Sequence, residues 1–318
     1  MGLMADRSWN HGISASRRRL LLGGAAVAGV ALISACGRRD EPETSGDEPA
    51  GPPPAPEGSL EWAVAGPWRV QDRGRDQWRH PVETLTFFGI EPDMRVIEMW
   101  PGVGWYTEIL APYLARGGGQ LIAAGFETGP EADPSLSQVM ARFEGRFAGD
   151  RRLYGDVEIT AFGPTSGPLA PTGTVDMVLF LRSLHAWMAA GIAEKAFADA
   201  YAALKPGGVL GVEQHRGASG ADQDPAAATG YVQEAFVKQL AAEAGFVFVA
   251  ASEINANPED TKDHPFGVDT LPPNGLTAPP GEPADPEFDR SRYDAIGESD
   301  RMTLKYRKPE CTPPPPPA

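Results

Sequence analysis

The chain has 318 residues, and its 28 Lys and Arg residues stand against 43 Asp and Glu residues, so the formal net charge is −15 at pH 7. An acidic surface of this kind repels phosphate backbones, which disfavours nucleic acid as a partner. Only two cysteines are present, Cys36 and Cys311, so no framework of several disulfides can replace a packed core.

The first 35 residues have the pattern of a cleaved export signal. Three arginines, Arg17 to Arg19, precede 16 uncharged residues, 20 to 35, a run too short to span a bilayer comfortably. The paired arginines resemble a twin-arginine export signal of bacteria, and the small residues before Cys36 resemble a lipobox. We therefore expect residues 1–35 to be removed and Cys36 to be lipidated; an ordinary N-terminal membrane anchor is the alternative.

The ends of the mature chain are predicted to be unpacked. Residues 36–59 are rich in proline and charge, which is typical of a flexible tether between a membrane and a domain. Residues 309–318 end in five prolines and should be extended. The prediction is a folded domain at residues 60–308, anchored through Cys36 and facing the periplasm.

Within this domain, apolar runs of strand length alternate with segments of helical periodicity, which predicts a doubly wound, Rossmann-like α/β sheet. The predicted strands are 95–99, 120–126, 157–162, 175–181, 209–214, 246–254 and 301–306. The predicted helices are 81–88, 105–115, 135–147, 192–205 and 231–244. A stretch rich in proline and glycine, 271–289, is expected to be a surface loop near the site or a disordered insertion.

Ligands of such a sheet bind at the carboxyl ends of its strands, and the first turn there is Glu98 to Gly104. Glycines in this turn allow the backbone to approach a ligand, and a carboxylate at the strand end can accept hydrogen bonds from it. A Gly-x-Gly turn is weak evidence alone, because tight turns need glycine for steric reasons. The third glycine of the nicotinamide fingerprint is absent, which disfavours that cofactor.

A second motif, Leu204-Lys-Pro-Gly-Gly208, follows that turn by about 100 residues. Together the two motifs resemble those of class I S-adenosylmethionine-dependent methyltransferases. The longer blocks RHPVETLTFFGI, PGVGWYTEILAPYL, LRSLHAW, EQHRG and SEINANPEDTKDHP are similar to a bacterial group of predicted, often exported, methyltransferase-like proteins. The resemblance implies S-adenosylmethionine as cofactor and a seven-stranded, mostly parallel sheet with a final antiparallel strand.

The resemblance also implies roles for residues of the first turn. Glu98 matches the acid that contacts the methionine part of the cofactor, and Gly102 and Gly104 match two of the three glycines. Pro101 lies in the same turn and belongs to the expected cofactor-binding set. Trp100 stands where the first glycine should be, and its indole could cover the pocket or fill it.

Two further residues complete the expected cofactor-binding set. In the family a carboxylate at the end of the second strand holds the ribose hydroxyls; here Gly125 is near that place, and Glu127 is a candidate that comes slightly late. Arg182 follows the fourth strand and is expected at the same edge of the sheet.

His185 and His215 follow the fourth and fifth strands, whose ends flank the methyl group in this family. Because the unperturbed pKa of histidine is about 6.5, either residue could act as general base toward an oxygen or nitrogen nucleophile. A helix cap or a plain hydrogen-bonding role is the structural alternative for each. A metal site built from these histidines, Glu213 and His264 lacks any short HxH or HxxxH spacing, so no metal is predicted.

The sequence therefore supports methyl transfer from S-adenosylmethionine to a small molecule as the first hypothesis. The second is a non-catalytic ligand-binding lipoprotein of the periplasm with a methyltransferase fold, because the donor is made in the cytoplasm and Trp100 departs from the donor-binding pattern. A metal-dependent hydrolase is the third. The arginines of residues 69–79 are expected to form a partly paired polar stretch.

Overall fold

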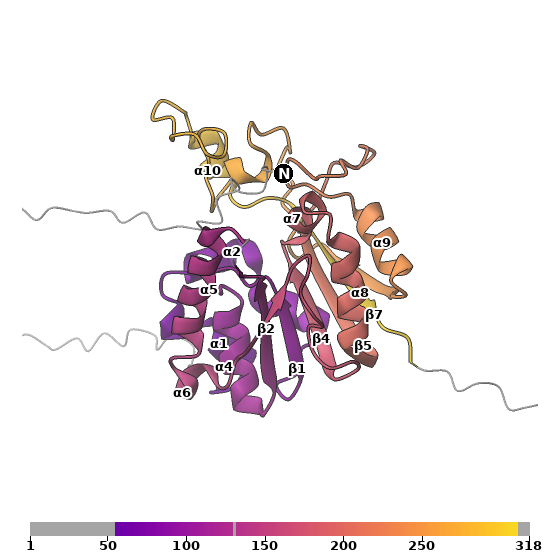
Figure 1. Cartoon of the computed structure of the whole chain (residues 1–318). Coiled ribbons are helices and arrows are strands. Elements are labelled where there is room, and N and C mark those ends of the chain that lie inside the picture. Colours follow the sequence, from indigo (N-terminus) through magenta and orange to yellow (C-terminus); the bar gives the residue numbers. More distant parts are fainter. Residues whose placement is uncertain (1–54, 130–131, 311–318) are drawn as a thin grey trace, which may run out of the picture. The chain divides into compact units, whose positions relative to one another are not determined.

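Seven strands form one mixed sheet in the computed structural model, which describes residues 55–129 and 132–310 (Figure 1). The strand order is β3-β2-β1-β4-β5-β7-β6, and β7 runs antiparallel to both β5 and β6. The expected mostly parallel sheet with a final antiparallel strand is confirmed, and that strand lies between the fifth and the sixth. The predicted signal peptide, with Cys36, and the end of the tail, with Cys311, lie outside the described residues.

The strands match the predicted segments closely, with one exception at β5. Their bounds are β1 Arg95–Met99, β2 Gln120–Phe126, β3 Glu158–Phe162, β4 Val175–Leu181, β5 Leu204–His215, β6 Val247–Ser252 and β7 Arg301–Arg307. The sequence placed Lys205 in a helix and began the fifth strand at Val209. Leu204 instead pairs with Val175, because Pro206 disfavours helical backbone at Lys205 and the preceding helix ends at Ala203.

Five helices correspond to predicted ones: α3 Pro81–Phe88, α4 Thr107–Gly117, α5 Pro134–Phe147, α8 Ala193–Ala203 and α9 Glu234–Glu243. The others are short segments that show too little periodicity to be recognised from sequence. These are α1 Leu60–Val64, α2 Asp76–Arg79, α6 Arg151–Tyr154, α7 Leu184–Ala189 and α10 Ser291–Ile296, with the 3-10 turns η1 Pro67–Arg69, η2 Arg73–Arg75 and η3 Gly267–Thr270.

Alternate residues of each strand pack against helices on opposite faces of the sheet. On β1, Ile97 and Met99 contact the layer that contains α7, α8 and α9, whereas Val96 contacts the layer with α1, α3, α4 and α5. Glu98 shares the face of Val96 because side chains alternate along a strand. The Glu98 carboxyl group is thus directed into the layer that contains α4.

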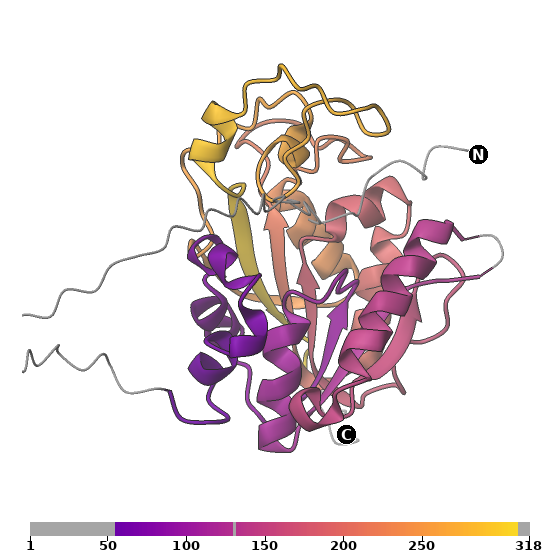
Figure 2. The ribbon, with the colours of Figure 1, turned by 90° about the vertical axis from the view of Figure 1, so that its left-hand side faces the viewer.

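Loops gather beyond the carboxyl ends of the parallel strands. Figure 2 shows α10 and the segments around it above that edge of the sheet. Residues 271–289 contain no helix or strand, and only Leu271 among them is fully buried. Among the described residues no helix is long and apolar enough to cross a membrane.

Candidate functional site

The turn after β1 has the backbone conformation that close ligand approach requires. Gly102 and Gly104 have φ values of 60° and 92°, in the left-handed region, and Gly104 N donates to Pro101 O at 2.9 Å. A Cβ on Gly104 would lie 2.2 Å from Phe147, so this glycine packs the turn against α5. A Cβ on Gly102 would meet no atom within 4 Å, so this part of the turn is open to a ligand.

Glu98 is a buried acid with one strong hydrogen bond. Its side chain is 2% exposed, and Oε2 accepts from Thr107 Oγ1 at 2.6 Å. Burial raises the pKa of Glu98 to about 7, while the Thr107 hydrogen bond and the nearby Arg182 charge oppose that rise. The carboxyl group therefore titrates near neutral pH.

Trp100 fills space above the ends of β2 and β3. It has φ 48°, in the left-handed region expected of the glycine that it replaces, and its indole Nε1 donates to Phe162 O at 2.9 Å. The ring lies against Phe126, Phe162 and Trp187, with centroid distances of 4.8, 6.3 and 5.8 Å. Edge-to-face aromatic contacts of this kind hold the indole in place.

Glu127 is engaged with the loop that follows β3. Its carboxylate accepts from Thr165 N at 3.0 Å and also from Thr165 Oγ1, and these hydrogen bonds lower its pKa. Gly125, at the position expected for a ribose-binding acid, is a packing residue, because a Cβ there would lie 2.2 Å from Met140. The end of β2 therefore offers no unengaged carboxylate among these positions.

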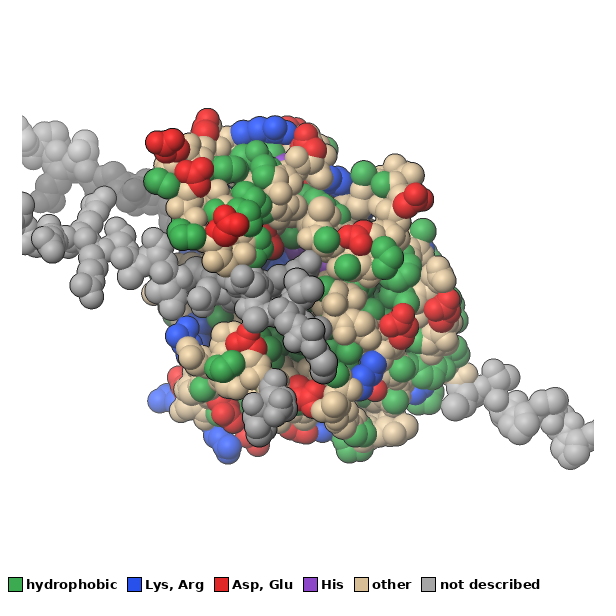
Figure 3. Space-filling model, turned by 45° about the horizontal axis from the view of Figure 1, so that its top comes forward, with side chains coloured by type: hydrophobic (Ala, Val, Ile, Leu, Met, Phe, Trp, Pro, Cys, Tyr) green, Lys and Arg blue, Asp and Glu red, His purple; other side chains and the backbone are tan. Residues whose placement is uncertain are grey.

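The edge of the sheet also carries two histidines, which the structure brings together. Figure 3 brings this edge forward and shows histidine side chains in a hollow between the surrounding loops. The rings of His185, on α7, and His215, at the end of β5, have centroids 5.2 Å apart. Both residues lie at the strand ends where the sequence analysis expected them.

The hydrogen bonds of the two rings constrain their chemistry. Gln214 Nε2 lies 3.2 Å from His185 Nδ1 and donates to Gly230 O at 3.1 Å, which assigns this atom as the amide nitrogen. His185 Nδ1 is then an acceptor, and the proton of the neutral ring is on Nε2. Burial lowers the pKa of His215 well below its usual value, and the charges of Arg301 and Arg182 lower it further, so His215 is neutral at physiological pH.

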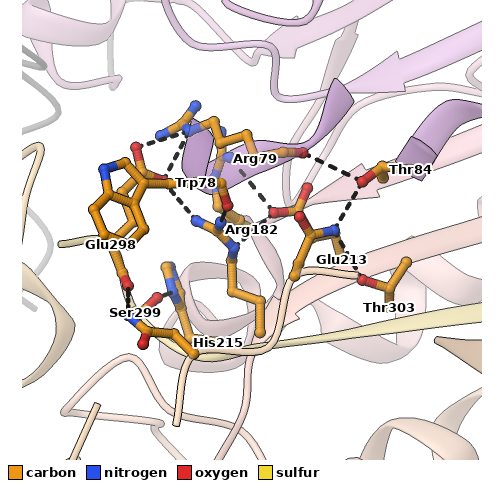
Figure 4. Close-up of polar contacts among 12 residues, drawn as sticks. Trp78, Arg79, Thr84, Arg182, Glu213, His215, Glu298, Ser299 and Thr303 are labelled. Atoms are coloured by element: carbon orange, nitrogen blue, oxygen red, sulfur yellow. Dashed lines mark hydrogen bonds and ion pairs between the residues drawn. The ribbon is translucent and has the colours of Figure 1, made fainter. Parts of the chain in front are cut away.

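A buried network of arginines and glutamates, which sequence reasoning did not find, lies beside the same edge (Figure 4). Arg301 pairs with both glutamates of the network. Arg301 Nε lies 2.9 Å from Glu213 Oε1, and Arg301 Nη1 donates to Glu298 Oε2 at 2.6 Å. Arg182, which has φ 63° at the end of β4, lies 3.6 Å from Glu213 Oε1. Tyr106, two residues after Gly104, donates to Glu213 Oε2 at 3.0 Å.

The network also connects the N-terminal helical turns to β7. Arg75 Nε and Arg79 Nε donate to Glu298 Oε1 at 3.1 and 2.9 Å, and Arg79 Nε reaches Oε2 at 2.8 Å. Burial raises the pKa of Glu298, but the charges of Arg301, Arg182 and Arg75 outweigh it and hold the pKa below its usual value. No local pattern marks these partners, because more than 200 residues separate Glu298 from Arg75 and Arg79.

The remaining polar segments serve the structure. Arg69 is fully buried and pairs with Asp76 at 2.8 Å, so part of the arginine stretch is paired as expected. His264 Nε2 lies 2.8 Å from Asp260, which also accepts from Tyr231. In residues 55–129 and 132–310, no group of three His, Cys, Asp or Glu side chains is arranged to hold a metal ion.

Comparison with known proteins adds a likeness in fold. No family model and no curated protein matches the sequence. An S-adenosylmethionine-dependent methyltransferase from Aquifex aeolicus is similar in structure, with 17% identity, a TM-score of 0.46 and coverage of 59% of this chain and 90% of that one. An arsenic(III) S-adenosylmethionine methyltransferase from Chlamydomonas reinhardtii has 16% identity and a TM-score of 0.42, with coverage of 81% of this chain and 75% of that one. An S-adenosylmethionine-dependent methyltransferase from Mesorhizobium loti has 14% identity and a TM-score of 0.40, with coverage of 71% of this chain and 96% of that one.

Proposed function

We propose that this protein transfers a methyl group from S-adenosylmethionine to a small-molecule acceptor at the carboxyl edge of the sheet. The observation that carries the proposal is the turn Glu98 to Gly104, a buried acid followed by left-handed glycines at the end of β1. It stands in a sheet whose strand order and antiparallel β7 are those of the methyltransferase fold. Ligands of such sheets bind where the strand order reverses, which here is the β1–β4 boundary.

The residues of the turn fit one half of the donor better than the other. The Glu98 carboxyl group can accept from the ammonium group of the methionine half, and the open backbone at Gly102 leaves room for its carboxylate. The nucleoside half would lie above β2 and β3, where the Trp100 indole is hydrogen-bonded to Phe162. Donor binding therefore requires the indole to leave this position.

When bound, S-adenosylmethionine supplies an electrophilic methyl group, and the chain would position the acceptor toward it. His185 and His215 are the residues that we assign to this task. Because Gln214 donates to His185 Nδ1, a neutral His185 ring carries its proton on Nε2 and is a hydrogen-bond donor there. The lowered pKa of His215 makes it a weak base, so we assign both histidines to positioning the acceptor rather than to proton transfer.

Calorimetry with S-adenosylmethionine and its demethylated product tests the proposal. We expect Glu98→Ala to weaken binding and Trp100→Gly, which restores the glycine pattern, to tighten it by about tenfold or more, corresponding to at least 1.4 kcal/mol. Circular dichroism of both variants provides the control for folding. The absence of heat with both the wild type and Trp100→Gly would overturn donor binding.

The position of the Trp100 indole favours a second candidate, a ligand-binding protein that uses the methyltransferase fold without the donor. Native mass spectrometry of the protein from the periplasmic fraction separates the two. A retained nucleoside contradicts the second candidate, whereas an empty protein whose Trp100→Gly variant also fails to bind the donor supports it.

We also propose that the protein is exported and anchored through lipid on Cys36, facing the periplasm. The motivation is the sequence pattern before Cys36, and a route that exports folded proteins could carry the donor out already bound. Cys36→Ser should move the protein from the membrane to the soluble fraction. Recovery of this variant with membranes would show that lipid on Cys36 is not the sole anchor.

A further inference from the structure

The buried network beside the site has more guanidinium groups than carboxylates to pair with them. Arg75, Arg79, Arg182 and Arg301 pair with Glu213 and Glu298. Figure 4 shows Arg79 and Arg182 beside the two glutamates. Within the described residues, four guanidinium nitrogens of these arginines are buried without a hydrogen bond. Arg301 Nε still lies 2.9 Å from Glu213 Oε1, which leaves Arg75 Nη2, Arg79 Nη1 and Arg182 Nη1. Buried N–H groups of charged side chains are normally paired, so these three indicate a missing acceptor.

The two carboxylates cannot supply it. Both oxygens of Glu298 already accept from arginines, and Glu213 Oε2 accepts from Tyr106. Glu213 Oε1 also lacks a hydrogen bond, but it is ion-paired with Arg301 Nε at 2.9 Å and lies 3.6 Å from Arg182 Nη1, beyond hydrogen-bonding distance. Asp72, 4.0 Å from Arg75 Nη1, is also too far for a hydrogen bond.

The unpaired nitrogens come from three separate elements that meet at the carboxyl edge. Arg75 ends η2 and Arg79 ends α2, and both share Glu298 Oε1; Arg182 follows β4. Arg79 is 2% exposed, whereas the side chains of Arg75 and Arg182 are 20% and 16% exposed, so the cluster has an opening to solvent. It lies at the β4, β5 and β7 part of the sheet, on the other side of β1 from Glu127.

We propose that this arginine cluster, Arg75, Arg79 and Arg182, binds an oxyanion, a carboxylate or phosphate group of the acceptor molecule. Guanidinium groups present planar pairs of N–H donors that match such oxygens. On an otherwise acidic chain, a local excess of positive charge selects anionic ligands. The inference rests on the proposed function only in naming the ligand as the acceptor, because it places the anion away from β2 and β3.

The test measures thermal unfolding of the full chain with sodium acetate or inorganic phosphate, at ionic strength held constant with sodium chloride. A ligand of the native state raises the unfolding midpoint. We expect a rise for the wild type that is at least halved in Arg75→Gln and in Arg182→Gln, and partly kept in Arg182→Lys. The anion that raises the unfolding midpoint more, acetate or phosphate, identifies the bound group of the acceptor as a carboxylate or a phosphate.

Arg151→Gln is the matched control, because Arg151 is 71% exposed and pairs only across the surface with Asp156. It should respond as the wild type does. Equal responses in all variants, or none in the wild type, would overturn the anion site. Should the arginine variants fail to fold, isothermal calorimetry of phosphate and acetate with the wild type decides, and no saturable heat refutes the site.

A second arm repeats the titration with saturating S-adenosylhomocysteine. An anion response that persists supports an acceptor site, and one that disappears shows that the arginines hold the carboxylate of the donor, which overturns our assignment. If the protein binds anions through these arginines but shows no heat of binding with S-adenosylhomocysteine, the methyltransferase proposal is refuted and the anion site is supported.

Discussion

Glu298→Gln tests the carboxylate of the buried network that pairs with three arginines. The Glu298 side chain is 4% exposed and meets three guanidinium groups, those of Arg75, Arg79 and Arg301. Glutamine keeps one acceptor oxygen but removes the charge and directs an amide NH2 toward the arginines. Two of the three arginines are themselves buried, at 2% and 1% exposed, so their charges cannot be hydrated instead.

Removal of one partner from a buried ion pair costs about 3–5 kcal/mol, because the remaining charge is left uncompensated. We expect a loss of that size in the free energy of unfolding at pH 7, measured by urea denaturation of the full chain with an unchanged slope. The arginine charges hold the pKa of Glu298 below its usual value of 4.5, so this contribution is present above that pH and is lost as the pH falls further. The difference between variant and wild type should shrink accordingly below about pH 4.5.

Glu253→Gln is the matched control for this measurement. Glu253 is 69% exposed and pairs with Arg216 at 2.7 Å, and Arg216 keeps Asp300 as a second partner. An exposed pair contributes about 0–1 kcal/mol. A Glu298→Gln variant no less stable than Glu253→Gln would refute the reasoning that the network joins the N-terminal segment to β7.

Two further predictions concern the turn after β1. Burial raises the pKa of Glu98 from its usual 4.5 to about 7, so wild-type stability falls as the pH rises from 4.5 to 7. Glu98→Gln should remove this pH dependence, which amounts to at most about 3 kcal/mol, as measured by denaturation at several pH values. Gly104→Ala should cost about 3–4 kcal/mol in urea, from left-handed strain and a clash with Phe147. Gly118→Ala, with φ 84° and open space, should cost only about 1–2 kcal/mol, and equal losses would contradict the clash.

The strands and the main helices could be predicted from the sequence because their signals are local. The alternation of apolar residues and the glycines that end each segment depend on neighbours a few positions away. The turn at Glu98 was found for the same reason, since its acid and glycines are consecutive. His185 and His215 were placed at one edge because parallel strands end there together.

The sequence did not predict short helical segments, nor the contacts of side chains whose partners are distant along the chain. Glu127 was a candidate for a ligand, yet it is engaged by Thr165, which no spacing along the chain reveals. The sequence left open whether Trp100 covers or fills the pocket, and its contacts with Phe126 and Phe162 show the indole lying over the ends of β2 and β3.

The sequence by itself determined the succession of strands and helices along the chain and the turn that marks the candidate site. Only the tertiary structure decided which charges meet: Arg75 and Glu298 are 223 residues apart and are brought together because β7 enters the sheet beside β5. The strength of a buried ion pair depends on the distance between the two charges and on their removal from water, and the spacing of residues along the chain determines neither.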